Sequence, residues 1–241
     1  MISESSSKPS GSAAWRQLTL DLELPPHFGR DDFLVSKANA SAFQMIEAWP
    51  EWPDSVMLLL GAAGAGKSHL AAIWAARAGA DIISASALKE TDLAKLAAKP
   101  ALVIENAEAI GAAEEADLFH LLNLARERKT SMLFTARRRP DLWGLATADL
   151  LSRLRLAPAV ELGTPDDALL NAVLVKLFCD RQLIVEAAVV DYIALHIDRS
   201  LDMARCVVAL LDREGLARGG KVTRTMAREL LRSLDVADDE A

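Results

Sequence analysis

Hydrophobic residues follow two different patterns along the chain, and the change between them divides it. Between residues 33 and 163, short apolar runs alternate with longer segments in which apolar residues recur every three or four positions. The short runs are typical of buried parallel strands and the longer segments of amphipathic helices. The predicted strands span residues 55–60, 81–83, 101–104 and 131–135, and the predicted helices 38–49, 70–79, 88–98 and 116–128. This alternation predicts an α/β domain with a parallel sheet over residues 29–163.

From residue 164 the pattern is helical only. The predicted helices span residues 166–181, 186–196, 201–215 and 223–234, so residues 164–241 are expected to form a small all-α domain. Residues 1–28 differ in composition from both of these regions. Their first dozen positions are rich in serine and carry too little apolar surface to offset the entropy of ordering, so we expect a flexible N-terminal segment.

Composition and charge then narrow the class of protein. With 241 residues, 51% of them hydrophobic, the chain can bury a substantial core. Its 27 Lys and Arg against 34 Asp and Glu leave a net charge of −7, which disfavours a broad DNA-binding surface. No apolar run reaches the ~20 residues of a membrane span. Cys179 and Cys206 lie in apolar helical patterns without metal-ligand spacing, so we expect two buried thiols in a cytoplasmic protein.

One motif carries strong chemical information. The segment Gly61-Ala62-Ala63-Gly64-Ala65-Gly66-Lys67-Ser68 matches G-x-x-x-x-G-K-[ST], between a predicted strand and a predicted helix. The glycines let main-chain N–H groups point at phosphate oxygens, Lys67 would reach the β- and γ-phosphates, and Ser68 would bind Mg²⁺. The motif predicts bound ADP or ATP with Mg²⁺. The alternative is an ordinary glycine-rich turn.

Several segments, in this order, resemble the AAA+ ATPases and, within them, the Hda family of DnaA-related regulators of replication initiation. The resemblance covers about residues 17–234. It rests on the phosphate loop, FLVS at 33–36 with Asn39 and Ala42, LVIEN at 102–106, LFT at 133–135, LSRL at 151–154 and the four C-terminal helices. It implies an AAA+ sheet with a helical lid, in a negative regulator that stimulates hydrolysis of DnaA-bound ATP. In this family FLVS lies where the adenine is held, and His69 joins the nucleotide site.

By this resemblance LVIEN takes the place of the Walker B strand. Glu105 would hold Mg²⁺, whereas Asn106 stands where a second acid normally polarises the attacking water. Asn106 cannot accept a proton, so weak intrinsic ATPase activity is expected, with Glu108 as a substitute acid; a plain buried strand is the alternative. Thr135 takes the place of a sensor of the γ-phosphate. The arginines at 137–139 are interpreted as a solvated loop in preference to a partner-binding patch.

Two arginine roles are also implied by the resemblance. Arg153 matches the arginine finger, which acts on a nucleotide held by a neighbouring protein; the alternative is a surface ion pair with Asp149. In the lid, Asp202 stands where a sensor arginine is usual. Arg205, one turn later, is preferred as its replacement over Arg199.

The N-terminal segment contains a second motif. Residues 17–22, QLTLDL, resemble the peptide with which bacterial proteins bind the β sliding clamp of DNA polymerase III. Gln17 would make directional hydrogen bonds, while Leu18, Leu20 and Leu22 supply apolar contacts. An edge strand or a domain-covering arm is the alternative.

The partners implied are therefore the clamp and DnaA, and self-association is left open. No helix-turn-helix pattern follows residue 234, which disfavours an initiator and specific DNA binding. The alternative functions are an AAA+ loader or adaptor with its own ATP turnover, and a non-catalytic adaptor in which nucleotide only stabilises the fold.

Overall fold

The structure, a computed structural model, describes residues 28–218 and 220–239. Five strands of the described chain pair in parallel in one sheet, in the order β2-β3-β4-β1-β5. The strands are β1 (Val56–Gly61), β2 (Asp81–Ser84), β3 (Ala101–Glu105), β4 (Ser131–Ala136) and β5 (Ala159–Leu162). The three strands predicted from continuous apolar runs are the three central ones, because only they are covered on both faces.

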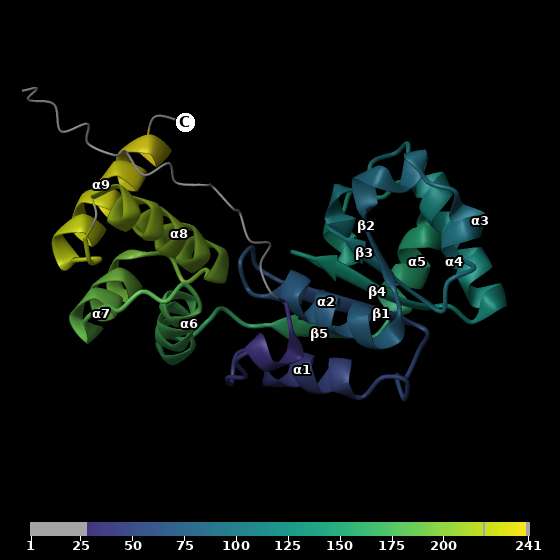
Figure 1. The fold of residues 1–241 in the computed structure, drawn as a ribbon. Helices are drawn as coiled ribbons and strands as arrows, with labels where there is room; N and C mark the ends of the chain where they lie inside the picture. The colour runs from purple at the N-terminus through teal and green to yellow at the C-terminus, as the bar shows by residue number, and fades with distance from the viewer. Residues whose placement is uncertain (1–27, 219, 240–241) are drawn as a thin grey trace, which may run out of the picture.

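Helices cover both faces of this sheet (Figure 1). One face packs on α1 (Ala40–Glu47) and α2 (Lys67–Ala78), and the other on α4 (Glu115–Arg128) and α5 (Ala148–Leu156). Successive strand residues point to opposite faces, so the two cores share each central strand. In β1, for example, Leu59 enters the α1/α2 core and Leu58 the α4/α5 core. Each fully buried leucine contributes about 1.5–3 kcal/mol, which fixes the strand ends that carry the site.

Two parts of the α/β region differ from the sequence prediction. The expected helix at 88–98 is divided into a 3-10 helix, η2 (Ala85–Glu90), and the short α3 (Leu93–Leu96). The division occurs because Thr91 is extended and the Asp92 side chain caps α3 at the Lys95 N–H. Strand β5 and helix α5 were not predicted as elements. β5 is a short edge strand in which Ala159 and Glu161 are exposed, so it does not form a continuous apolar run.

The chain after β5 is helical. It contains α6 (Asp167–Asp180), α7 (Ala187–His196), α8 (Leu201–Arg218) and α9 (Arg224–Asp239), which pack around a core of their own beside the sheet (Figure 1). The prediction of two buried thiols is wrong, because Cys179 and Cys206 are both exposed. Their neighbours Phe178 and Val207 take the buried helix positions instead.

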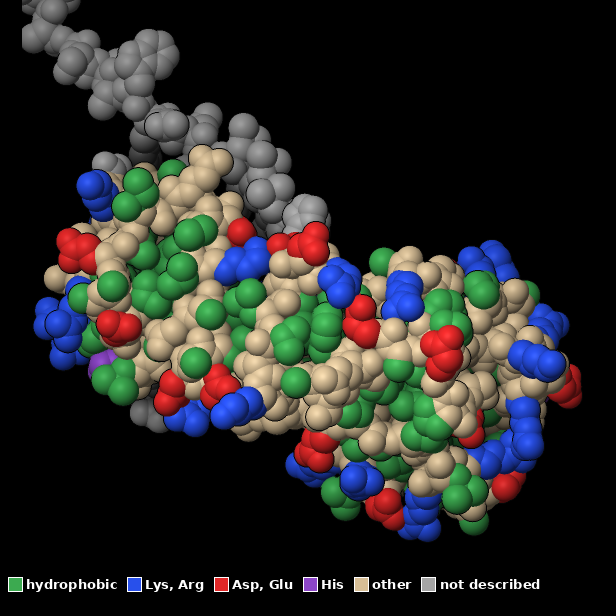
Figure 2. Space-filling model, turned by 90° about the horizontal axis from the view of Figure 1, so that it is seen from below, with side chains coloured by type: hydrophobic (Ala, Val, Ile, Leu, Met, Phe, Trp, Pro, Cys, Tyr) green, Lys and Arg blue, Asp and Glu red, His purple; other side chains and the backbone are tan. Residues whose placement is uncertain are grey.

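The surface is mixed in charge. On the face shown in Figure 2, Lys and Arg side chains are interspersed with Asp and Glu side chains over both parts of the molecule. Among the described helices, none has both the length and the apolar character that crossing a membrane requires.

Candidate functional site

The phosphate loop lies at the carboxyl end of the central strand β1. It leaves the sheet at Gly61, which is paired with Leu162 of β5, and it ends where α2 begins at Lys67. Thr135 of β4 is paired with Leu59 of β1, so the predicted sensor lies beside the loop. Ligands of open parallel sheets bind at this edge, outside the carboxyl ends of the strands.

The loop has the conformation that its glycines permit. Gly64 (φ 68°) and Gly66 (φ 101°) are left-handed, and Gly66 directly precedes α2. The first N–H groups of α2 therefore point toward the loop opening, together with the positive end of the helix dipole. Ser68, one residue into α2, is exposed. The arrangement is suited to an anion.

Lys67 is folded across this loop. Its Nζ donates to the carbonyl oxygens of Gly61 and Ala62, both at 2.8 Å, and the side chain is largely buried. Burial lowers the pKa of Lys67, and the carboxylate of Glu108 partly opposes that shift. A phosphate bound here would supply a negative counter-charge and so offset the loss of hydration that the buried ammonium group suffers.

The start of α8 is docked onto the same loop. The Leu201 N–H donates to the Gly64 carbonyl oxygen at 2.8 Å, and the Ser200 hydroxyl accepts from the Met203 N–H at 3.3 Å. A Cβ placed on Gly64 would overlap the Ser200 Oγ. Sequence reasoning missed this contact, because Ser200 shows only a helix-cap signal and Gly64 only a loop signal. The glycine thus serves both the loop and the lid.

Gly64→Ala tests this double constraint. We expect the left-handed φ to cost about 1–2 kcal/mol in the free energy of unfolding, and the overlap with Ser200 at least ~1 kcal/mol more. Gly79→Ala is the matched control, since Gly79 has φ 64° but nothing within 4 Å of its Cβ position. Urea denaturation measures both. Equal losses in the free energy of unfolding for the two variants would show that the contact between Ser200 and Gly64 does not restrict the loop.

The predicted metal residue Glu105 and the predicted sensor Thr135 lie at the ends of the paired strands β3 and β4. Glu105 ends β3, and the Asn106 N–H donates to the Thr135 Oγ1 at 3.2 Å. Thr135 is buried, whereas Glu105 is partly exposed and Asn106 is exposed. Oxygen donors from Glu105 and Ser68 are of the type that Mg²⁺ prefers.

An aromatic cluster lies on the other side of the loop. His69 is buried between Phe28 and Phe33, with ring centroids 5.2 and 5.1 Å away. Its Nε2 lies 2.9 Å from the Gly29 carbonyl oxygen, an acceptor, so this nitrogen carries the proton. Burial lowers the pKa of His69, so the ring is neutral at pH 7. Phe33 also stacks on Phe43 at 5.5 Å, which places the FLVS segment against the loop.

The two lid arginines have different surroundings. Arg205 pairs with Asp202 at 2.9 Å and lies over the Phe28 ring at 5.4 Å. Arg199 instead pairs with Asp167 at 2.8 Å, and both side chains are mostly exposed. Asp202 lines a cavity of about 580 Å³ between the phosphate loop and the start of α8. Arg205 is therefore the arginine of the helical part that lies next to the aromatic cluster, and its charge offsets that of Asp202.

Arg153 lies on α5, on the face of the sheet opposite α2. Its Nη1 donates to Asn123 Oδ1 at 2.6 Å, its Nη2 pairs with Asp149 Oδ2 at 3.0 Å, and its guanidinium lies over Phe119 at 4.6 Å. The ion pair with Asp149 that the alternative interpretation required is therefore present. The side chain is nevertheless 37% exposed, with its orientation held by α4. Gln17, Leu18, Leu20 and Leu22 lie outside the described residues.

No family model and no curated protein sequence matches the chain, but solved structures do. Domain III of the replication initiation protein DnaA from Thermotoga maritima superposes with a TM-score of 0.76 at 19% identity, over 87% of this chain and 98% of that one. AMPPCP-bound DnaA from Aquifex aeolicus superposes with a TM-score of 0.68 at 16% identity, over 80% of this chain and 67% of that one.

The Thermotoga maritima RuvB Holliday junction branch migration motor gives a TM-score of 0.66 at 18% identity, over 86% of this chain and 72% of that one. The chain thus has the fold that DnaA domain III and RuvB share. The predicted fold class, a parallel sheet with flanking helices and a helical C-terminal part, is confirmed.

Proposed function

We propose that this protein is an Hda-like AAA+ regulator, which binds a nucleotide itself and stimulates hydrolysis of ATP bound to DnaA. The observation that carries the proposal is the placement of Arg153. Its side chain is partly exposed and is held by Asn123 and Phe119. Arg153 lies on the opposite face of the sheet from α2, the helix that follows this chain's phosphate loop. An arginine so placed is suited to a nucleotide held by another protein. Conversion of DnaA–ATP to DnaA–ADP would lower initiation of replication.

The chain's own nucleotide is ADP or ATP with Mg²⁺. Main-chain N–H groups of the phosphate loop and Lys67 would hold the phosphates, and Ser68 and Glu105 would contribute oxygens to the metal. The likeness to DnaA described with AMPPCP supports this assignment. His69 and Phe33 form the aromatic side of the site, and Arg205 approaches it from the lid.

Arg153 would act by charge. As the bond to the γ-phosphate of the DnaA-bound ATP breaks, negative charge develops, and a guanidinium beside it lowers the barrier. In the free protein the guanidinium is held by neutral Asn123, by Phe119 and by one exposed carboxylate. An exposed ion pair contributes little, about 0–1 kcal/mol, so it can be exchanged for a phosphate at small cost.

The direct test follows ATP hydrolysis on DnaA. Radiolabelled ATP is bound to DnaA, excess nucleotide is removed, and the protein is added with clamp loaded on DNA. We expect ADP to form on DnaA many times faster than without the protein. An unchanged rate would exclude the proposed function. An AAA+ loader would instead show substantial turnover of its own, lost in Lys67→Ala.

The N-terminal motif would tether the protein to the β sliding clamp. Two or three buried leucines, at about 1.5–3 kcal/mol each and less the ordering cost, predict an affinity of about micromolar. Gln17→Ala combined with Leu20→Ala should weaken clamp binding at least ~10-fold, the equivalent of one such leucine contact. Surface plasmon resonance on immobilised clamp measures it. Thr19→Ala, at an unspecified motif position, should bind normally; retention by the double variant would refute the tether.

A further inference from the structure

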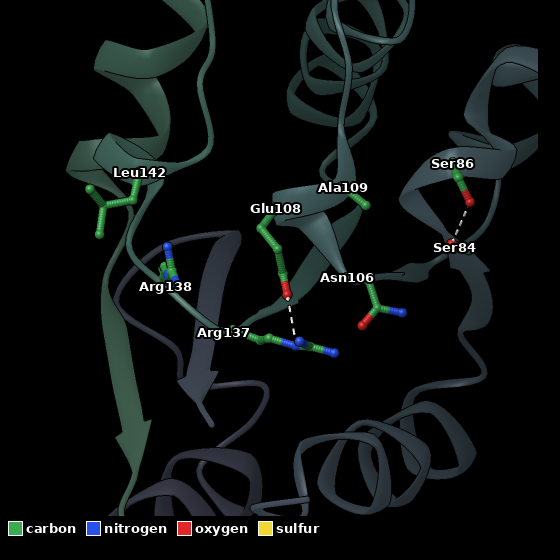
Figure 3. A pocket seen from close by; sticks show the side chains of 8 residues that line it. All are labelled: Ser84, Ser86, Asn106, Glu108, Ala109, Arg137, Arg138 and Leu142. Carbon is green, nitrogen blue, oxygen red and sulfur yellow. Dashed lines mark hydrogen bonds and ion pairs between the residues drawn. The ribbon is translucent and has the colours of Figure 1, made fainter. Parts of the chain in front are cut away.

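The chain turns sharply where β3 ends. Asn106 is left-handed, with φ 54° and ψ 48°, and a single 3-10 turn, η3 (Ala107–Ala109), follows it. Buried Ala107 and Ile110 anchor this turn in the core below the sheet edge. Glu108, between them, is therefore brought back beside the strand end, where Figure 3 shows it next to Asn106.

Glu108 and Asn106 line the same cavity. The cavity has a volume of about 630 Å³ and lies at the carboxyl ends of β2, β3 and β4 (Figure 3). Arg137, the second residue after Thr135, also lines it, and Figure 3 shows its side chain reaching Glu108. A carboxylate from the turn and a guanidinium from the strand end thus face each other where the Walker B strand and the sensor strand both end.

The Glu108 carboxylate is incompletely satisfied. Its Oε1 lies 3.6 Å from Arg137 Nε, an ion pair longer than a hydrogen bond. Its Oε2 is buried and has no hydrogen-bond partner among the described residues. A buried carboxylate oxygen without a donor is unfavourable, and its natural occupant is a water molecule or a substrate hydrogen. The Glu108 side chain is 21% exposed, so that donor can enter from the cavity.

The Glu108 carboxylate also acts electrostatically on Lys67 of the phosphate loop. Among the carboxylates that raise the pKa of Lys67, it has a larger effect than Asp202 or Glu105. Lys67 is the residue that would bind the terminal phosphates. Arg137, the ion-pair partner of Glu108, directly follows β4, and β4 pairs with β1, which leads into the phosphate loop. Glu108 therefore lies at the same edge of the sheet as the loop.

We propose that Glu108 is the catalytic acid–base residue of this chain's own ATPase site, replacing the carboxylate that Asn106 lacks, with Arg137 as its positioning residue. The inference rests on the proposed nucleotide binding. The water oxygen forms a bond to the γ-phosphorus, and the bond from that phosphorus to the β–γ bridging oxygen breaks. ADP leaves with the electron pair. Glu108 accepts a proton of the water and then returns it to the departing phosphate.

The test is a single-turnover assay without DnaA. The protein is held in excess over radiolabelled ATP with Mg²⁺, so that hydrolysis is followed for hours. Loss of a general base typically slows a reaction about 10²–10⁴-fold, so Glu108→Gln should reduce the rate at least ~10²-fold. Its ATP affinity should not fall, because glutamine keeps the shape of the side chain and removes a negative charge from the neighbourhood of the phosphates. Glu127→Gln, an exposed carboxylate on α4, is the matched control and should hydrolyse at the wild-type rate.

A rescue variant separates catalysis from structure. Asn106→Asp places a carboxylate at the conventional position, and in the Glu108→Gln background it should restore hydrolysis to within about tenfold of wild type. A purely structural defect would not respond. The proposal is overturned if Glu108→Gln hydrolyses at the wild-type rate, if it loses ATP binding, if the rescue fails, or if the wild type binds ATP without hydrolysing it. Absence of ATP binding in the wild type would instead refute the proposed nucleotide site.

Discussion

Arg153→Ala should reduce the stimulated hydrolysis of DnaA-bound ATP by about 10³-fold or more, toward the rate of DnaA alone. An arginine finger contributes about 10³–10⁵ in rate because it neutralises charge that appears only in the transition state. Arg153 is held against Phe119 at 4.6 Å and bound to Asn123 at 2.6 Å, so its position is set before any partner binds. Such preorganisation makes the loss on truncation large.

The measurement is the rate of ADP formation on DnaA with clamp loaded on DNA. Arg155→Ala is the matched control, because Arg155 lies on the same helix, is exposed and pairs with Asp141. It should stimulate normally. Arg153→Ala should still bind nucleotide and clamp, which separates a catalytic defect from misfolding. Full stimulation by Arg153→Ala would leave this side chain with a structural role only, through its contacts with Asn123, Phe119 and Asp149.

Lys67→Ala should weaken the protein's own binding of ADP and ATP at least ~100-fold. Two charge-assisted hydrogen bonds to phosphate, each about 1.5–3 kcal/mol, are lost, and 2.8 kcal/mol already corresponds to about 100-fold. The carbonyl oxygens of Gly61 and Ala62 lose their buried donor as well. Removing the cation therefore leaves these two carbonyl oxygens without their donor beside the bound phosphate.

Fluorescence competition with a labelled ADP analogue measures this loss. Lys95→Ala, a lysine on the short helix α3, is the control and should bind as the wild type does. If Lys67→Ala bound ADP with unchanged affinity, the nucleotide would have to lie elsewhere on the molecule.

Much of the sheet could be predicted from sequence because its central strands are buried on both faces. β1, β3 and β4 are continuous apolar runs for that reason. β5 is an edge strand with Ala159 and Glu161 exposed, and so few residues cannot establish an alternating pattern. The helix expected at 88–98 failed because the capping preference of Asp92 prevailed over the apolar periodicity.

The site could be predicted as far as its chemistry is local in sequence. The phosphate loop is one continuous motif, and the ends of β3 and β4 meet it because parallel strands end at one edge. The contact of Ser200 and Leu201 with Gly64 joins segments far apart in the chain, with no local signal for either side. The position of the Glu108 carboxylate depends on the left-handed backbone of Asn106, which residue spacing alone does not determine.

Nucleotide binding at the phosphate loop is the central claim for this chain's own site, and titration calorimetry of the protein with ADP and Mg²⁺ tests it most directly. We predict one binding site per chain, with heat that disappears when Lys67 is replaced by alanine. The absence of binding heat in the wild type, or an equal signal in the Lys67 variant, would contradict the account.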